Sequence, residues 1–449
     1  MVLAEAVSAG HTRERNPAPG AFIPTMRSTV LVLCGAIVLL VACASGEKPY
    51  LPRPLEADVE ARGETILRDG LAIPRLPSPP AEGLRLPLRS RLAPLVQCTT
   101  STGESAMFEL DTGSWRTFVT AREVDRLRLP IREIPEVDCV TLLGSCKFSR
   151  CARIDRLKLS DPWISPIDAV VFDFPFDIAG TLGVNVFGQV PVLFDVSRDE
   201  VLLLPEKHED VLWGRYGDRD WNDLPLGWFG GFPYVTLAVR GVKLRMLFDT
   251  GSTSSCLVPR VAQSLGLQDL GTDSFEEVDA SGSHFAEHRG YHVEGMTFGD
   301  WILDFESWST EGDMLCPEAD GLLGFDVLRR IPFVFDARRD LVRILEPEML
   351  LGRALRVDPD EETVAELRDP YPPFRKDALA GMASSEKLKY ASLVAERLDD
   401  VDDSVVAEAA RALSVFAKES WSEESQVERA RRWWQAHRND PEFARPATK

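Results

Sequence analysis

Two stretches of this 449-residue chain carry the same four residues, Asp-Thr-Gly-Ser, and each one begins with an acid. Asp111–Ser114 follows Met107-Phe-Glu-Leu, and Asp249–Ser252 follows Met246-Leu-Phe. One Asp-Thr-Gly is a weak signal, because Asp and Gly open many ordinary turns. Two copies, each at the end of an apolar, strand-like run, indicate a matched pair of rigidly held carboxylates.

Such a pair has a definite chemistry. Two carboxylates placed face to face cannot both ionise easily, so they share one proton. One can then act as a general base on a water molecule while the other donates a proton to a carbonyl oxygen. Gly113 and Gly251 permit the sharp turn and close approach that a larger residue would forbid. The pattern predicts acid–base hydrolysis at Asp111 and Asp249.

The sequence around the two runs repeats as a whole. Gly183 lies 12 positions before Asp195, and Gly324 lies 12 positions before Asp336. We interpret the repeat as duplication of a β-rich lobe, far longer than the units of solenoid arrays. Asp195 and Asp336 begin matching tight turns, so we expect them to form turns and not a second acid pair.

Apolar runs bounded by turn residues predict strands through both copies. The first lobe is expected over residues 86–206 and the second over 231–348, with a Trp- and Gly-rich interlobe linker at 207–230. Helices are expected over 121–129, before Pro130, and over 258–266, which ends at a glycine.

The N-terminal region has the pattern of a secretory signal. An apolar run from Val30 to Ala42 follows Met26-Arg27 and precedes Cys43, and it is short for a membrane-spanning helix. Residues 1–43 are therefore interpreted as a leader and signal segment, and the Pro-rich residues 44–85 as a tether. An uncleaved anchor or a plain signal peptide remains an alternative.

The C-terminal region, residues 353–449, is expected to be a helical module. Its Ala, Glu, Arg and Leu content rises, and apolar residues recur at helical spacing. We expect helices over 377–383, 387–398, 404–417 and 425–436, with Ser404 as the N-cap of the third.

Charge and cysteine content narrow the function classes. The formal net charge of −20 argues against nucleic-acid binding, which needs basic patches. Beyond the signal segment six cysteines remain, an even count that suits disulfides in an oxidising compartment. Cys256 could pair with Cys316, and buried or free thiols are the alternative for all six. The disulfide candidates are Cys98, Cys139, Cys146, Cys151, Cys256 and Cys316.

The two lobes resemble the retropepsin-like aspartic proteases of bacteria, in a tandem, pepsin-like single-chain arrangement. The resemblance covers roughly residues 86–348 and is carried by both Asp-Thr-Gly-Ser runs, with Gly180-Thr-Leu-Gly183 and Gly321-Leu-Leu-Gly324. It implies a mainly β fold of two similar acid-protease lobes, followed by a small all-α module that loosely resembles HEAT repeats. The implied activity is that of an aspartic endopeptidase acting on polypeptides, with no cofactor.

The resemblance also implies roles for single residues. Asp111 and Asp249 would be the catalytic pair, and Thr112 and Thr250 would interlock the two loops. The remaining assignments are Ser114 and Ser252 orienting the carboxylates, Gly183 and Gly324 in strands that support the loops, and Gly144, Ser281 and Gly282 at the tips of flap hairpins.

Leu40-Val-Ala-Cys43 resembles a bacterial lipobox, which implies cleavage before Cys43 and lipidation of its thiol. Ala44 follows the cysteine, which favours the outer membrane. The expected location is the bacterial cell envelope, with the chain lipid-anchored to the membrane. The C-terminal helices would then be a platform for a protein partner or a substrate, or a brace on the second lobe.

Three interpretations stay open at this point: an active single-chain pair, a catalytically silent peptide-binding or scaffold lipoprotein, and lobes that pair between two chains. His284, His288 and His292 recur every four residues, but glycines interrupt any helix there, so we expect surface histidines and not a metal site.

Lipidation at Cys43 predicts the behaviour of the Cys43→Ser variant. Without the thiol no acyl chain can be attached, so radiolabelled palmitate should not enter the chain and the protein should leave the membrane fraction. The matched control is Cys34→Ser, nine positions earlier in the same segment. Undiminished labelling of Cys43→Ser would contradict the assignment.

Overall fold

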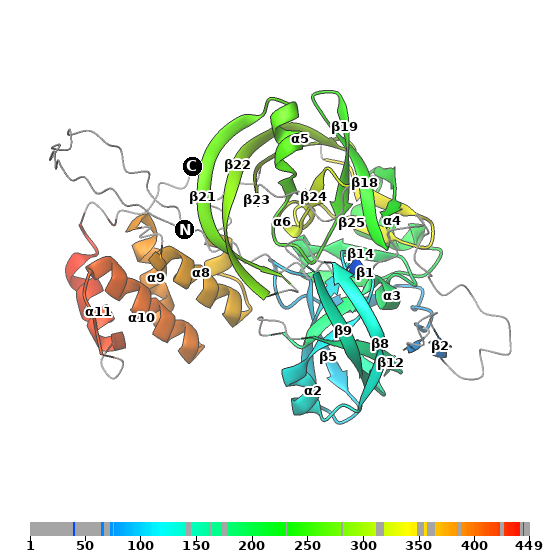
Figure 1. Ribbon diagram of the computed structural model, residues 1–449, viewed down its shortest axis with the longest axis horizontal. Helices are drawn as coiled ribbons and strands as arrows, with labels where there is room; N and C mark the ends of the chain where they lie inside the picture. The colour runs from blue at the N-terminus through cyan, green and yellow to red at the C-terminus, as the bar shows by residue number, and fades with distance from the viewer. Residues whose placement is uncertain are drawn as a thin grey trace, which may run out of the picture.

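The computed structural model describes most of the chain from residue 76 onward, and it has two β-rich lobes with a helical region beside them (Figure 1). The fold is mainly β with a smaller helical C-terminal region, as the sequence predicted. The described residues are 39–40, 64–66, 72–74, 76–140, 145–160, 163–164, 166–172, 178–229, 231–279, 282–310, 318–347, 354–356, 364–384, 388–422, 426–440 and 443.

A ten-stranded sheet builds the first lobe in the described residues. In spatial order its strands are β1 (Leu39–Leu40), β8 (Ile131–Val140), β9 (Ser145–Ile154), β12 (Ile167–Phe172), β7 (Phe118–Thr120), β13 (Gly180–Gly183), β6 (Ser105–Asp111), β5 (Leu95–Thr100), β10 (Leu157–Lys158) and β11 (Trp163–Ile164). β13 runs parallel to β6, and this pairing sets Gly183 opposite Asp111. Strand β2 (Glu64–Ile66) pairs separately with β3 (Ala72–Pro74).

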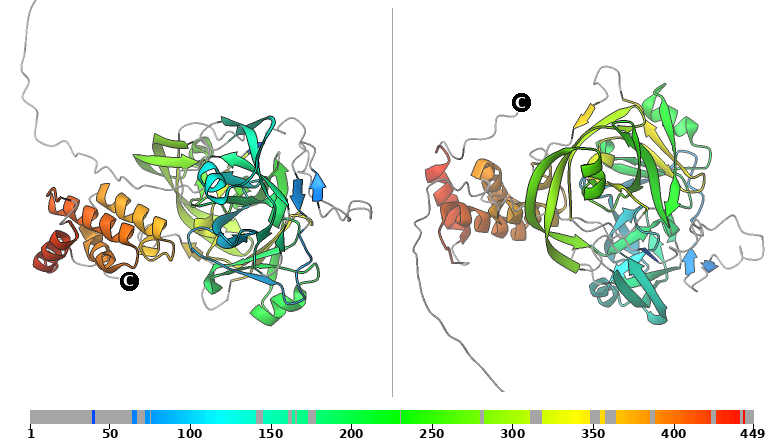
Figure 2. Two further views of the ribbon diagram at one scale, coloured as in Figure 1. Left: turned by 90° about the horizontal axis from the view of Figure 1, so that it is seen from below. Right: turned by 45° about the horizontal axis from the view of Figure 1, so that its top comes forward.

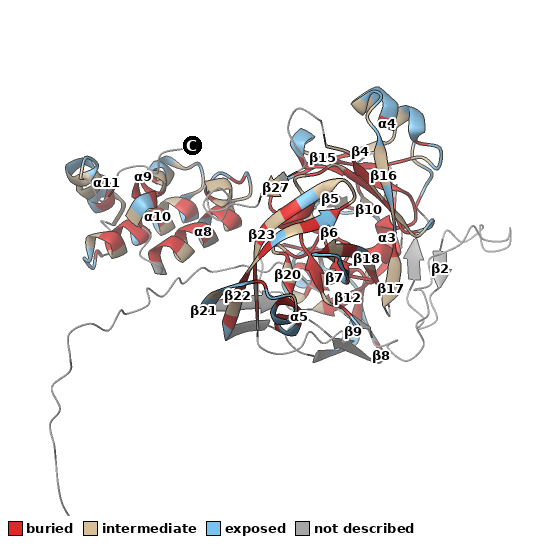
Figure 3. Ribbon diagram, turned by 90° about the horizontal axis from the view of Figure 1, so that it is seen from above, coloured by how far each residue is buried: buried red, intermediate tan, exposed pale blue. Residues whose placement is uncertain are grey.

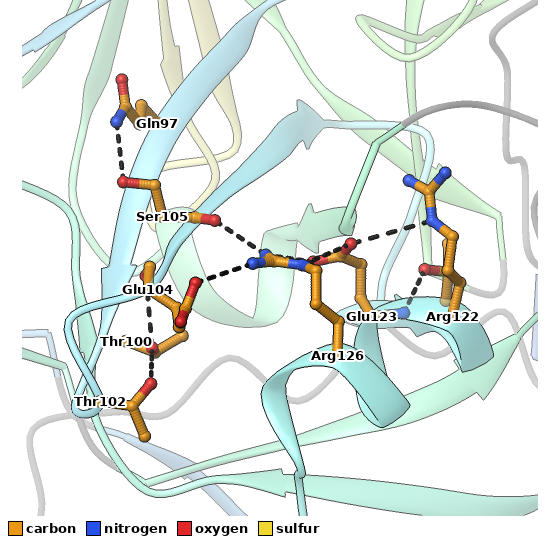
Figure 4. A network of polar contacts seen from close by, with 9 residues as sticks. Gln97, Thr100, Thr102, Glu104, Ser105, Arg122, Glu123 and Arg126 are labelled. Carbon is orange, nitrogen blue, oxygen red and sulfur yellow. Dashed lines mark hydrogen bonds and ion pairs between the residues drawn. The ribbon is translucent and has the colours of Figure 1, made fainter.

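Helix α2 (Ala121–Leu127) lies where the sequence predicted a helix before Pro130. Thr120 caps it by accepting a hydrogen bond from the Glu123 amide, and Arg128 ends it in a left-handed conformation with φ of 53°. Arg126 of this helix pairs with Glu123 at 2.6 Å and with Glu104 at 3.1 Å (Figure 4). The network ties the helix to the turn between β5 and β6, and β6 carries Asp111.

The second lobe repeats the main elements of the first in the same order, with fewer strands before the supporting strand. Its described strands, in spatial order, are β20 (Cys256–Leu257), β24 (Gly321–Leu323), β19 (Val242–Phe248), β18 (Phe232–Val239), β22 (Gly282–Phe298), β23 (Trp301–Thr310) and β27 (Ala354–Arg356), with β17 (Gly227–Phe229) and β21 (Gln268–Asp279) at the side. β24 runs parallel to β19, as β13 does to β6. Helix α5 (Pro259–Ser264) follows β20, as α2 follows β7.

A six-stranded sheet joins the two lobes. Its order is β16 (Trp221–Pro225), β26 (Leu341–Leu345), β25 (Phe333–Asp336), β14 (Val192–Asp195), β15 (Glu200–Leu203) and β4 (Leu84–Pro87). At its centre β14 of the first lobe pairs antiparallel with β25 of the second. Phe194 and Phe333 stack there with ring centroids 4.8 Å apart. The short helices α3 (Val184–Phe187) and α6 (Phe325–Leu328) precede β14 and β25.

The residues between the lobes have structure of their own. Helix α4 (Glu209–Tyr216) is followed by β16, which pairs along its whole length with β26. A 3-10 helix (Val196–Arg198) connects β14 to β15 in the joining sheet. The Asp195 carboxylate accepts a hydrogen bond from the Ser197 hydroxyl of this turn. Asp195 thus stabilises a turn, as the sequence predicted.

The helical region lies to one side of the lobes in each view (Figure 2). It contains α8 (Pro372–Ser384), α9 (Ala391–Glu396) between two 3-10 turns (Leu388–Tyr390 and Arg397–Asp399), α10 (Asp403–Ala417) and α11 (Gln426–His437). The facing sides of these helices are buried (Figure 3). Asp402 caps α10 by accepting from two backbone amides, so the expectation that Ser404 is the N-cap was wrong.

The segment that leads into α8 contacts the first lobe. Asp369 accepts hydrogen bonds from the Ser90 hydroxyl and the Arg91 amide, both at 2.9 Å. Phe374 packs in one cluster with Leu95 and Ile178 of that lobe. Within the described residues no helix is long and apolar enough to cross a membrane.

The joining sheet predicts the effect of Phe333→Ala. The ring is fully buried against Phe194 and Phe248, so its removal should lower the free energy of unfolding by about 3–5 kcal/mol. Urea denaturation measures the change. Val401→Ala, at a side chain 98% exposed, is the control and should stay within about 0.5 kcal/mol. Equal effects of the two variants would contradict the packing account.

Candidate active site

The two aspartates lie at equivalent places in the two lobes. Asp111 is the last residue of β6, and Asp249 directly follows β19. The two residues are 0% and 1% exposed, and each carboxyl group lies against the glycine of the opposite loop. The structure therefore brings the two predicted residues together within one chain.

Hydrogen bonds between the two threonines hold the loops against each other. The Thr250 hydroxyl accepts from the Thr112 amide at 2.9 Å and donates to the Leu110 carbonyl at 2.7 Å. The Thr112 hydroxyl accepts from the Thr250 amide at 2.9 Å and donates to the Phe248 carbonyl at 2.8 Å. Each loop thus depends on the opposite lobe for its position, as the resemblance implied.

Gly113 and Gly251 are required by the close approach of the carboxyl groups. A Cβ atom at Gly113 would lie 2.3 Å from Asp249 Oδ1, and one at Gly251 would lie 2.4 Å from Asp111 Cγ. Neither distance is compatible with a side chain larger than hydrogen. Each glycine therefore makes room for the aspartate of the other lobe.

The supporting strands also need glycine where they pass behind the loops. A Cβ atom at Gly183 would lie 2.3 Å from the Arg116 carbonyl oxygen, and one at Gly324 would lie 2.4 Å from that of Ser254. Each glycine is the N-cap of a short helix, α3 or α6, so the strand turns away directly behind the aspartate loop.

The hydroxyls of the serines after the two glycines close their own loops. Ser114 donates to the Arg116 carbonyl at 2.7 Å, and Ser252 donates to the Ser254 carbonyl at 3.0 Å. The backbone amide of Ser252 lowers the pKa of Asp249, so this serine acts on the carboxylate through its backbone and not through its hydroxyl.

Two further polar pairs support the loops and were missed in the sequence. Thr117 donates to Asn185 at 3.1 Å in the first lobe, and Ser255 donates to Asp326 at 2.7 Å in the second. The Ser255 hydroxyl also accepts from the Gly324 amide at 2.9 Å. Each pair joins an aspartate loop to the helix behind it. Their matching positions in the duplicated lobes were the available signal.

The environments of the two carboxyl groups differ. Asp249 Oδ1 accepts from the Gly251 amide at 2.9 Å, whereas neither carboxyl oxygen of Asp111 has a hydrogen-bond partner within the described residues. Burial raises the pKa of Asp249 to about 6, against the lowering effect of its hydrogen bonds. Burial, with the charges of Asp249 and Glu109, raises the pKa of Asp111 well above its usual range. Burial and the neighbouring charges therefore favour one proton on the pair.

The proposed flap tips fall on two long hairpins. β8 pairs with β9 in the first lobe and β21 with β22 in the second, each between an aspartate loop and a supporting strand. Gly282 begins β22 opposite Asp279. Gly144 and Ser281 lie outside the described residues, so their place in a flap stays a prediction.

The cysteine predictions have mixed outcomes. Cys98 and Cys151 are buried free thiols on β5 and β9, and four strands separate β5 from β9 in the sheet. The expectation that these two form disulfides was therefore wrong. Cys139 and Cys146 are opposite each other in the β8–β9 register, but their side chains lie outside the described part, as does Cys316, the expected partner of Cys256.

The histidine prediction was partly wrong. His288 lies on β22 and is fully buried, and burial lowers its pKa to about 4. His292 of the same strand is half-buried and lies 3.2 Å from Asp304. His284 is also on β22, and its side chain lies outside the described part. The long β22 strand, which continues into the core, explains the burial of His288.

The raised pKa of Asp249 predicts a pH dependence of stability. Its folded pKa of about 6 exceeds the unfolded value of about 3.9, so the folded chain binds more protons between these limits. This contribution to stability is complete below about pH 4 and is lost as the pH rises through about 6. The Asp249→Asn variant lacks this pH-dependent contribution to stability. Urea denaturation from pH 4 to 7 should show wild-type stability falling relative to the variant, and a constant difference would contradict the account.

Comparisons with known proteins agree with this geometry in the second lobe. A family model described as "Aspartyl protease" matches residues 235–327, which include the Asp249 loop and the Gly324 strand. No curated protein matches the chain. Among solved structures, an aspartic proteinase from Irpex lacteus is similar at 12% identity and a TM-score of 0.39, covering 59% of this chain and 97% of that one. The second lobe is thus similar in sequence to the aspartyl proteases.

Proposed function

We propose that this chain is an aspartic endopeptidase with one active site, formed by Asp111 of the first lobe and Asp249 of the second. The observation that carries the proposal is the pair of buried carboxyl groups, each packed against the glycine of the opposite loop where the two lobes meet. The family match over the second lobe supports it independently. No ion pair compensates either carboxyl group within the described residues, and burial under these conditions favours one proton on the pair.

The asymmetry of the pair assigns the two roles. Asp249 carries the negative charge, since backbone amides stabilise it there, and acts as general base on the attacking water. Asp111 holds the proton and donates it to the carbonyl oxygen as the water oxygen bonds to the carbonyl carbon. The proton taken up by Asp249 then passes to the leaving nitrogen, the C–N bond breaks, and a proton returns to the pair from the tetrahedral intermediate.

Substrate access needs movement around the pair. Asp111 and Asp249 are buried, so a polypeptide reaches them only if a covering element shifts. We propose that the β8–β9 and β21–β22 hairpins open and close over the site, as flaps that exclude water during the reaction. The contacts of Asp369 and Phe374 with the first lobe support a bracing role for the helical region.

The proposal also covers the cellular location of the protein. We propose that the chain is anchored by a lipid at Cys43 in a bacterial cell envelope, so that its polypeptide substrates lie outside the cytoplasm. The Pro-rich residues 44–85 would then hold the lobes away from the membrane surface.

The proposal predicts the activity of two single variants. Wild-type protein lacking the signal segment should cleave unfolded peptides in mildly acidic buffer and be inhibited by pepstatin-type compounds. Asp111→Asn and Asp249→Asn should each lower kcat/KM by at least about 10²-fold, because each removes one member of the acid–base pair. Peptide cleavage followed by mass spectrometry measures this.

Asp125→Asn, at an exposed residue of α2, is the control and should keep wild-type activity. Folding of each variant is checked by circular dichroism. Retained activity in either active-site variant would overturn the pair. A folded wild-type chain that cleaves nothing would favour the silent peptide-binding alternative.

A further inference from the structure

A third carboxyl group lies beside the pair. Glu109 is on β6 two residues before Asp111, and alternate residues of a strand point to the same face. Its side chain is 2% exposed, and its Oε1 atom is buried without a hydrogen-bond partner. No hydrogen bond or ion pair satisfies this carboxyl group within the described residues.

Its neighbour across the strand pair has the same property. Thr181 of β13 is directly opposite Glu109 in the parallel register. Its hydroxyl is fully buried and, among the described residues, also has no hydrogen-bond partner. A buried polar group left without a partner costs about 1–3 kcal/mol. Two such groups side by side indicate that a ligand supplies the missing hydrogen bonds.

The duplication provides an internal comparison. The positions that correspond to Glu109 and Thr181 in the second lobe are Leu247 and Leu322, which are opposite each other in the β19–β24 register. These leucines pack in an apolar cluster with Phe232 and Ala319. Beside Asp249 this position is therefore filled by two packed leucines. Beside Asp111 the equivalent position holds two buried polar side chains.

The position relative to the pair indicates which part of a substrate would meet Glu109. Glu109 and Asp111 are alternate residues of one strand, and burial together with the charge of Asp249 raises the pKa of Glu109 well above its usual range. A peptide whose scissile carbonyl lies at the pair would thus place the side chain next to that bond against Glu109, on the side of the first lobe. The substrate side chain on the other side of the bond would meet Leu247 and Leu322 of the second lobe.

We propose that Glu109 and Thr181 form a subsite that accepts a cationic side chain, lysine or arginine, next to the scissile bond. The inference rests on the proposed function and names its substrate class. An ammonium or guanidinium group has donors for both the carboxylate and the hydroxyl, and a charged hydrogen bond is stronger than a neutral one. The formal net charge of −20 also attracts basic peptides.

The experiment compares peptides that differ at one side chain. A fixed peptide sequence carries lysine or norleucine, an uncharged residue of similar length, on one or the other side of the cleaved bond. For wild type, kcat/KM should be at least about 10-fold higher with lysine on one side only. Glu109→Gln and Glu109→Leu should bring this ratio to about 1, and Glu109→Asp should keep part of it.

Folding and binding measurements separate the outcomes. Glu109→Leu introduces the residue that stands at this position in the second lobe and removes the buried carboxyl group, so its melting temperature should equal or exceed that of wild type. If wild type cleaves nothing, the proposed function fails, and binding of fluorescein-labelled lysine and norleucine peptides to Asp249→Asn decides the subsite. A lysine-to-norleucine ratio near 1 on both sides, or a ratio that both Glu109→Gln and Glu109→Leu leave unchanged, overturns the inference.

Discussion

The hydrogen bonds between Thr112 and Thr250 are the interaction on which the site depends. Each hydroxyl accepts from the amide of the opposite loop and donates to a carbonyl at the end of the opposite strand. All of these groups are buried, so loss of one partner would leave others unsatisfied. Neither lobe can therefore hold its aspartate correctly alone. The six-stranded sheet, with β14 and β25 at its centre, holds the lobes at the required separation.

Burial and asymmetry together give the pair its chemistry. Removing two carboxyl groups from water disfavours their charged forms, and backbone amides offset more of this cost for Asp249 than for Asp111. Glu109 adds a further unfavourable charge near Asp111. A symmetric arrangement of loops therefore holds two carboxyl groups with different proton affinities, which is what an acid and a base acting in one step require.

Much of this site could be predicted from the residues, because the chemistry lies in short motifs. Asp111 and Asp249 each follow an apolar strand, and a duplicated strand–turn pattern brings such ends together. The serine roles could not be predicted, since a hydroxyl can close its own loop as readily as it can reach a carboxylate. Burial of Cys98 and His288 depends on long-range strand order, which local patterns do not specify.

Glu109 shows what a closer comparison of the two copies would have revealed. It lies within the first motif, where the second copy has Leu247. A charged residue on the buried face of a strand breaks the apolar pattern, and such a departure is expected at functional positions. The fold class could be predicted for a similar reason: strand alternation and helical periodicity differ clearly between residues 86–348 and the C-terminal helices.

The central claim is that one chain supplies both halves of one site. Co-expression of the Asp111→Asn and Asp249→Asn chains tests it most directly, with wild type measured at the same concentration. If the pair forms within a chain, every molecule in the mixture lacks one carboxylate, and we predict cleavage no faster than with either variant alone. If lobes paired between chains, some sites would contain both aspartates. Recovery of a substantial fraction of wild-type activity would contradict the account.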